Sequence, residues 1–384
     1  MTSKMKQLLD NRIRFIRILT SFSLFVGIVM SFNLWISDRT FPLCPVSDFI
    51  PASPVGMDVF IVGLALLLLG GGMISKHRMI FISLIVVFLL LFLQDQMRWQ
   101  PWAYMYFLML IPFSFKLDNE KLISYFQILI IGVYLWGGIH KFSADFIDNT
   151  YLTILMDMFG LDSPETIQSL GWLGYSIPII ELAIALLLIF PRTRFLGFVG
   201  VVITHLFILV FLVCIDSNTI LYPWNIAMVL FTGLLFYKNS EPMRIWERQS
   251  NLLRVFNFKA ILLFILLPAL SLFNNWDNYL SFKLFSGKTH LFYICIDNAH
   301  AHLIDPSLKP YYWEPEGLNN GVMISLNEWT LDELDIPFYP ETRVFKKVAS
   351  SFCETNSNPE IYIFTEFDRG FKEGPLEVFR CEDF

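Results

Sequence analysis

Residues 134–145 read YLWGGIHKFSAD, a stretch in which an apolar helix runs directly into the ionisable residues His140 and Lys141. Ionisable side chains at a membrane boundary are costly unless something pairs with them or uses them. On a helix, Tyr134, Gly138 and Lys141 share one face at spacings i, i+4 and i+7, and the glycine would let another group approach closely. The stretch therefore predicts a membrane helix that ends in a functional site.

The composition around this stretch is that of a polytopic membrane protein. Of the 384 residues, 55% are hydrophobic and only 16% are charged, and the mean hydropathy is +0.55. In ordinary soluble domains about a quarter of all residues are charged. The net charge of −6 and the absence of a basic stripe with interleaved aromatic residues argue against nucleic acid as a partner. The lipid bilayer is therefore the first expected partner.

Hydrophobic runs long enough to cross ~30 Å of hydrocarbon recur along the chain and predict about nine crossings. They begin near Ile18, Met57, Met79, Ile123, Ile177, Phe195, Ile220 and Ala260, with a shorter run at 103–115. Every second connection is basic, with Lys76, Arg78, Arg192, Arg194 and Lys238 among the charges, so the positive-inside rule predicts a cytoplasmic N-terminus. An odd number of spans then places the tail outside the bacterial inner (plasma) membrane.

From about Asn274 the composition changes to that of a small soluble domain. We therefore expect a transmembrane helical domain at 1–273 and an extracytoplasmic β-rich domain at 274–384. Alternating apolar residues predict strands at Ser281–Phe285, Leu291–Ile296, Gly321–Leu326 and Glu360–Phe367. Short helices are expected at Leu331–Leu334 and Thr342–Ser350.

All five cysteines lie on the expected outer side or at its border, where an oxidising compartment favours disulfides. Cys353 and Cys381 both fall in the tail, so we expect a disulfide between them, with Cys44 as a further tether. Because five is odd, at least one thiol stays free. Buried free thiols are the alternative for all of them.

Glu181, His205 and Asn225 place polar groups inside three hydrophobic runs. An unpaired carboxylate is expensive in hydrocarbon, so Glu181 needs a partner or a proton. Together with Lys141, Glu181 and His205 are expected to converge in the outer half of the bundle. The alternative is a set of interhelical hydrogen bonds that only hold the helices together.

Asp95 and Arg98 follow the third run at spacing i, i+3, which predicts an ion pair on one helix face, with Pro101 ending that helix. We expect this pair to join the same outer cluster. The alternative is an interfacial salt bridge within an aromatic belt.

Lys141 has two open interpretations. With a pKa lowered by burial it would act as a base toward a C–H or hydroquinone O–H proton. Paired with Glu181 or Asp145, it would instead stay an ammonium. The sequence leaves both open.

Several motifs resemble those of one membrane family. They include a D-x-x-x-W-x-x-x-x-Y pattern at Asp95, Trp99 and Tyr104, GIHKFSADF at 138–146 and YPWN at 222–225. In these features the chain resembles the HTTM superfamily, which includes the vitamin K-dependent gamma-glutamyl carboxylases. The resemblance implies an N-inside, multi-span fold with an outer soluble part.

The resemblance also implies a membrane quinol, similar to vitamin K, as cofactor and Lys141 as the catalytic base. His140, which stands where the family has another lysine, would tune that base, and Glu181 and His205 would orient it or relay protons. The expected cofactor contacts are Asp95, Arg98, Trp99, Trp102, Tyr104, Tyr134 and Asn225. Trp102 replaces the family's functional histidine and the tail is shorter than a carboxylase's, so propeptide recognition and glutamate carboxylation are not implied.

Two functions therefore compete. The first is a carboxylase-like or quinol-dependent membrane enzyme in which Lys141 removes a proton near the outer leaflet. The alternative is a non-catalytic membrane scaffold that binds an extracytoplasmic protein or a lipid through its tail. The sequence has no Rossmann glycine pattern, P-loop, haem CxxCH or structural-metal spacing, so no metal, haem or nucleotide cofactor is expected.

Overall fold

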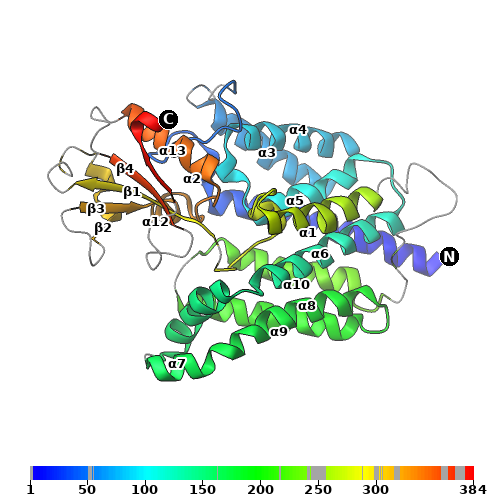
Figure 1. Cartoon of the computed structure of the whole chain (residues 1–384). Helices are drawn as coiled ribbons and strands as arrows, with labels where there is room; N and C mark the ends of the chain where they lie inside the picture. The colour runs from blue at the N-terminus through cyan, green and yellow to red at the C-terminus, as the bar shows by residue number, and fades with distance from the viewer. Residues whose placement is uncertain are drawn as a thin grey trace. The chain divides into compact units, whose positions relative to one another are not determined.

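The chain forms two compact units that interleave along the sequence in a computed structural model (Figure 1). The structure describes residues 3–50, 54, 56–161, 163–215, 218–239, 243, 257–287, 289–297, 302, 304, 306–314, 321–355, 362–367 and 377–384. The first unit, here called the helical unit, contains residues 1–29, 63–89 and 101–287. The second, the sheet unit, contains residues 30–62, 90–100 and 288–384. The predicted domain boundary at residue 274 stays a prediction, to which the structure adds that two earlier segments pack with the tail.

Among the described residues, five helices are long and apolar enough to cross a membrane. They are Lys6–Met30 within α1 (Ser3–Met30), α3 (Met57–Ile74), α6 (Asn119–Lys141), Gly171–Ile189 with α8 (Ser176–Ile189), and α9 (Arg194–Cys214). Three shorter apolar helices are α4 (Arg78–Gln94), α10 (Leu221–Phe236) and Asn257–Phe273. The protein is therefore a multi-pass integral membrane protein.

The expected crossing at 103–115 forms a short interior helix instead. Its residues belong to α5 (Pro101–Leu110) and the 3-10 turn η2 (Ile111–Ser114). The 10 residues of α5 are all buried in the protein. A helix of that length rises only about 15 Å, half of the ~30 Å hydrocarbon core. The prediction of nine crossings is not confirmed.

Helix α6 is the centre of the helical unit, and 89% of its most apolar window is buried in the protein. It packs against α8, α10 and the π-helical turn η6 (Leu262–Leu266), while α9 packs against both α8 and α10. The four helices α6, α8, α9 and α10 therefore form a bundle and lie side by side in Figure 1. Gly132 permits the close packing of α6, since a Cβ there would lie 2.7 Å from the carbonyl oxygen of Phe264.

Short helical turns connect the membrane helices. The connection from α6 to α8 contains η3 (Phe146–Tyr151), η4 (Ile154–Met158), α7 (Pro164–Leu170) and η5 (Gly171–Tyr175). The remaining short elements are α2 (Phe32–Trp35), η1 (Gln96–Arg98), η7 (Leu267–Phe273), η8 (Tyr279–Ser281), η10 (Pro306–Tyr311) and η12 (Cys381–Asp383).

The sheet unit is built on a five-stranded antiparallel sheet in the order β2-β3-β1-β4-β5. The strands are β1 (Leu291–Asp297), β2 (Tyr312–Trp313), β3 (Gly321–Ser325), β4 (Tyr362–Phe367) and β5 (Glu377–Arg380), and its helices are α12 (Leu326–Leu334) and α13 (Thr342–Thr355). Phe292 of the central strand β1 packs on Phe345 of α13, with ring centroids 4.7 Å apart. Tyr293 on the opposite face contacts Trp313 of β2. The alternation along β1 therefore turns every second side chain toward the covering helices.

Most of the predicted tail elements are confirmed. Strands β1, β3 and β4 lie where three of the four strands were expected, and α12 and α13 contain both expected helices. The stretch Ser281–Phe285 is not a strand, because Ser281 ends the turn η8 and both Phe282 (φ 57°) and Phe285 (φ 48°) have left-handed backbone. Two such residues interrupt the extended conformation that alternation requires.

The predicted disulfide between Cys353 and Cys381 is confirmed, and it joins α13 to η12. The expected tether from Cys44 is wrong, because Cys44, Cys214 and Cys295 are free thiols. Cys44 is buried, and its backbone N–H donates to Asp95 Oδ1. Burial raises the pKa of the Cys44 thiol, which keeps this residue in its unreactive protonated form.

Replacing Cys353 and Cys381 together by serine should destabilise the sheet unit. The disulfide closes a loop with a sequence separation of 28, for which loop entropy predicts a loss of about 3–4 kcal/mol. Thermal unfolding of the full chain measures this loss, with Cys295→Ser as the control that removes a free thiol. Equal unfolding of wild type with and without reductant would contradict the expected contribution.

Candidate functional site

Lys141 and Glu181 form a buried ion pair between α6 and α8. Lys141 is the last residue of α6, and its Nζ donates to both carboxylate oxygens of Glu181 at 2.9 Å. The two side chains are only 11% and 10% exposed. The geometry is that of a salt bridge in which one carboxylate binds the lysine through both of its oxygens. The base role of Lys141 stays a prediction that requires this pair to open.

Two glycines of α6 make room for the ion pair. A Cβ on Gly138 would lie 2.8 Å from Leu182 Cγ and 3.0 Å from the backbone oxygen of Pro178, so α8 packs directly on the α6 backbone there. A Cβ on Gly137 would lie 3.0 Å from Glu181 Oε2. The close approach that the sequence predicted at Gly138 is therefore confirmed, and the approaching group is α8.

Tyr134, His205 and Asn225 form a second polar group across α6, α9 and α10. Asn225 Nδ2 donates to the Leu221 carbonyl at 2.8 Å, which leaves Asn225 Oδ1 as the acceptor for His205 Nδ1 at 2.6 Å. This network assigns the ring hydrogen to Nδ1, so Nε2 accepts from the Tyr134 hydroxyl at 2.7 Å. The chain of hydrogen bonds thus runs in one direction through a neutral imidazole.

His140 lies beside Lys141 in sequence but contacts a different element. Its Nε2 is 3.3 Å from Ser271 Oγ, and its ring packs against Trp136. The Ser271 hydroxyl also donates to the Pro268 carbonyl at 2.6 Å. His140 therefore ties α6 to residues 257–273.

Asp95 and Arg98 belong to the sheet unit, so their convergence with the polar groups of the bundle stays a prediction. Asp95 caps the turn η1 by accepting from the Met97 N–H, and Pro101 starts α5 rather than ending a helix. The expected pairing of Asp95 with Arg98 is loose, at 3.9 Å, whereas Arg39 approaches Asp95 to 2.6 Å. Sequence reasoning missed Arg39, whose only signal is a charge in the loop after the first run.

The Arg98 side chain binds backbone carbonyls from two segments of the sheet unit. Its guanidinium donates to the carbonyls of Leu34, Trp35 and Leu91 at 2.9–3.1 Å. Burial lowers the pKa of Arg98 to about 10, which still leaves the side chain charged at neutral pH. The contacts fix segments 30–62 and 90–100 to each other.

Besides Tyr134, three aromatic residues were expected to contact a cofactor, and each has different neighbours. Trp99 Nε1 donates to the Phe92 carbonyl at 3.0 Å. The ring of Trp102 lies against Gly27, where a Cβ would come within 2.4 Å of it. Tyr104 packs near Phe282, with ring centroids 6.1 Å apart. These contacts are those of packed side chains, and a role toward a cofactor stays a prediction.

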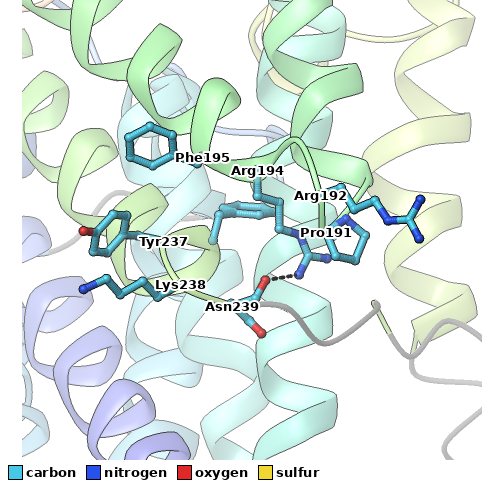
Figure 2. A pocket seen from close by; sticks show the side chains of 8 residues that line it. Pro191, Arg192, Arg194, Phe195, Tyr237, Lys238 and Asn239 are labelled. Atoms are coloured by element: carbon cyan, nitrogen blue, oxygen red, sulfur yellow. Dashed lines mark hydrogen bonds between the residues drawn. The ribbon is translucent and has the colours of Figure 1, made fainter.

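The structure also contains a cavity that the sequence did not predict. It lies where α8 and α10 end and α9 begins, and Figure 2 shows its lining. Three of the basic residues that served to orient the chain, Arg192, Arg194 and Lys238, line it. A count of loop charges predicts that such residues lie at a membrane face, but it does not predict which loops lie next to each other in the fold.

The comparison with known families bears on the bundle. Residues 119–241 match the family model of the methylamine utilisation protein MauE. The match includes α6, α8, α9 and α10, and so both polar groups described above, but spans less than half of the chain. The resemblance to the HTTM superfamily is wrong, because the matching family is a different one. No curated protein and no solved structure matches the chain.

Glu181→Gln should destabilise the bundle by about 3–5 kcal/mol, because it leaves the Lys141 ammonium buried beside a neutral group. The double variant Lys141→Met/Glu181→Leu should recover most of that loss, since replacing both charges by apolar side chains removes the unpaired ion. Thermal unfolding in detergent measures both. An equal loss in the single and double variants would argue against a charge penalty.

Gly138→Ala should lower stability more than Gly137→Ala. The added methyl at Gly138 meets backbone atoms of α8, which cannot turn aside, whereas at Gly137 it meets the end of the flexible Glu181 side chain. Overpacking of this kind costs about 1–3 kcal/mol. The same unfolding assay compares the two variants, and the reverse order would show that the helices do not pack here as described.

Proposed function

We propose that this protein is a non-catalytic membrane scaffold that presents its sheet unit to a protein partner outside the membrane. The observation that carries the proposal is that the polar side chains of the bundle bind one another. Lys141 pairs with Glu181, and Tyr134, His205 and Asn225 form one hydrogen-bonded chain. Such pairing holds helices together in an apolar medium, and it gives the buried charges of Lys141 and Glu181 a partner inside the protein.

The sheet unit has the internal connections that a rigid binding surface needs. Glu333 of α12 accepts from the Thr40 hydroxyl at 2.6 Å and from Trp329 Nε1 at 2.8 Å. Arg343 of α13 donates to Gln96 Oε1 at 2.7 Å. These bonds join α12 and α13 to segments 30–62 and 90–100. A surface fixed before binding loses less conformational entropy when a partner docks.

The disulfide and the sheet edges support an extracytoplasmic partner. A disulfide persists in an oxidising compartment, which favours a tail outside the cytoplasm. The terminal strands of the described sheet expose apolar side chains, Val378 on β5 at 51% and Trp313 on β2 at 39%. Exposed edge strands accept an added strand from another chain. We infer that the partner docks along one of these edges.

Site-specific photo-crosslinking in cells tests the scaffold proposal. A photoreactive amino acid at Val378 or at Trp313 should give one discrete adduct, whereas the same amino acid at exposed Phe49 in the same unit serves as control. Because residues 119–241 resemble a methylamine utilisation protein, growth with methylamine is the first condition to use. A cytoplasmic location of the tail, shown by thiol labelling of introduced cysteines, would refute the proposal, and so would edge positions that crosslink no more than Phe49.

A quinol-handling site is the second candidate, favoured by the direction of the Tyr134–His205–Asn225 chain. Asn225 holds the His205 ring through Nδ1, which leaves Nε2 as the acceptor. Nε2 would accept a quinol proton if Tyr134 moved aside. Mass spectrometry of co-purified quinones separates the candidates. Selective quinone enrichment that His205→Gln abolishes in a folded protein would favour the quinol site. Bulk phospholipid alone in both proteins would favour the scaffold.

A further inference from the structure

The cavity at the ends of α8 and α10 has the form of a ligand site. Its volume is about 400 Å³, and it is lined by Pro191, Arg192, Arg194, Phe195, Phe236, Tyr237, Lys238 and Asn239. These residues come from the connection between α8 and α9, from the first turn of α9 and from the end of α10 and the residues after it (Figure 2). Two connections that are far apart in sequence thus form one hollow.

The described lining is positively charged. Arg192, Arg194 and Lys238 contribute three cations, and none of the described lining residues is acidic. A fourth cation, Arg12 of α1, donates to the backbone carbonyl of Tyr237 at 2.9 Å. Three cations around one cavity favour an anionic ligand, and arginine suits the oxygens of a phosphate group.

Arg194 is a fixed and buried part of this lining. It is 1% exposed, and its guanidinium donates to the carbonyls of Leu188 at 3.2 Å and Asn239 at 2.9 Å, the second of which is the dashed line in Figure 2. The guanidinium also lies over the ring of Phe236, 5.7 Å from its centroid. The position of this charge is therefore set before any ligand arrives.

The solvent- or lipid-exposed rim of the cavity is aromatic and apolar. Phe195 and Tyr237 are 58% and 38% exposed, and their ring centroids are 6.2 Å apart. Beyond them, α9 exposes Leu196 and Ile203. Cations beside exposed aromatic rings, followed by an apolar helix surface, are typical of the headgroup level of a membrane protein. A free anion would contact only the cations, whereas a lipid would contact the cations with its headgroup and the apolar surface of α9 with its acyl chains.

We propose that this cavity binds the phosphate headgroup of an anionic phospholipid. The exposed side chains of Arg192 and Lys238 turn to the phosphate when it binds, the buried Arg194 adds a fixed charge beside it, and the acyl chains run past Phe195 along α9. With the cytoplasmic N-terminus that the loop charges predict, the site lies in the inner leaflet. The assignment is independent of the proposed scaffold function and of the polar groups at the other end of the bundle.

Native mass spectrometry of the full chain tests the proposal with phosphatidylglycerol as the probe and phosphatidylcholine as the neutral lipid. The test variant is Arg192→Gln/Lys238→Gln, which removes two exposed cavity charges, and the matched control Lys76→Gln/Arg78→Gln removes two exposed charges from another connection. Wild type and control should retain phosphatidylglycerol. The cavity variant should bind it about tenfold more weakly or worse, as expected for two lost charges beside an anionic lipid.

Three results would overturn the assignment. The first is equal retention by wild type and the cavity variant, and the second is an equal loss in the control, which would indicate general surface charge. The third is competition by inorganic phosphate alone that matches the lipid, which would make the ligand a free phosphate ion. Photo-crosslinking of wild type with a photoreactive phosphatidylglycerol gives a readout without any substitution. Crosslinks should map to residues 191–195 and 237–239, and their absence there would overturn the proposal even if the cavity variant does not fold.

Discussion

The bundle depends on one constraint, which is that charge placed in a low-dielectric interior must meet its opposite. Lys141 at the end of α6 and Glu181 near the start of α8 satisfy that constraint for each other at 2.9 Å. The pair fixes which face of α8 turns toward α6, and Gly137 and Gly138 let the two helices come close enough for it. Apolar packing between membrane helices is poorly directional, because lipid tails are as apolar as the side chains, so the polar contacts carry much of the specificity.

The same constraint applies to the second polar group of the bundle, which lies near enough to the first for Lys141 to act on His205 and Glu181 on Tyr134 electrostatically. His205 obtains its partners from Tyr134 and Asn225, so it has no need of the Lys141–Glu181 pair. In the sheet unit, Asp95 likewise obtains Arg39, while Arg98 is occupied by backbone carbonyls. Each buried polar group takes a partner from an element that its own packing brings near.

The sequence predicts those features of the structure that depend on neighbouring residues, and it misses those that depend on contacts between distant segments. Hydropathy is local, so the long helices follow from it, and the expense of an unpaired Glu181 correctly pointed to a partner such as Lys141. Strands β1, β3 and β4 follow from alternation, but Phe282 and Phe285 show that alternation does not report a left-handed backbone. Arg39 was missed because its pairing with Asp95 exists only once segments 30–62 and 90–100 have packed together. The family resemblance failed because it rested on short motifs of aromatic and basic residues, which apolar helices with polar ends share across unrelated families.

The basic residues of the cavity show a further limit of reading charge from sequence. A charge needed only to orient the chain has no reason to be buried, since burial costs free energy that exposure avoids. Arg192 and Lys238 are exposed, as topology alone would have them, but Arg194 is 1% exposed. Its guanidinium holds the Leu188 carbonyl in the last turn of α8 and the Asn239 carbonyl just beyond α10. A cation suits the negative ends of both helix dipoles. Arg194 therefore joins two helix ends and, in doing so, fixes one charge in the wall of the cavity that Arg192 and Lys238 also line.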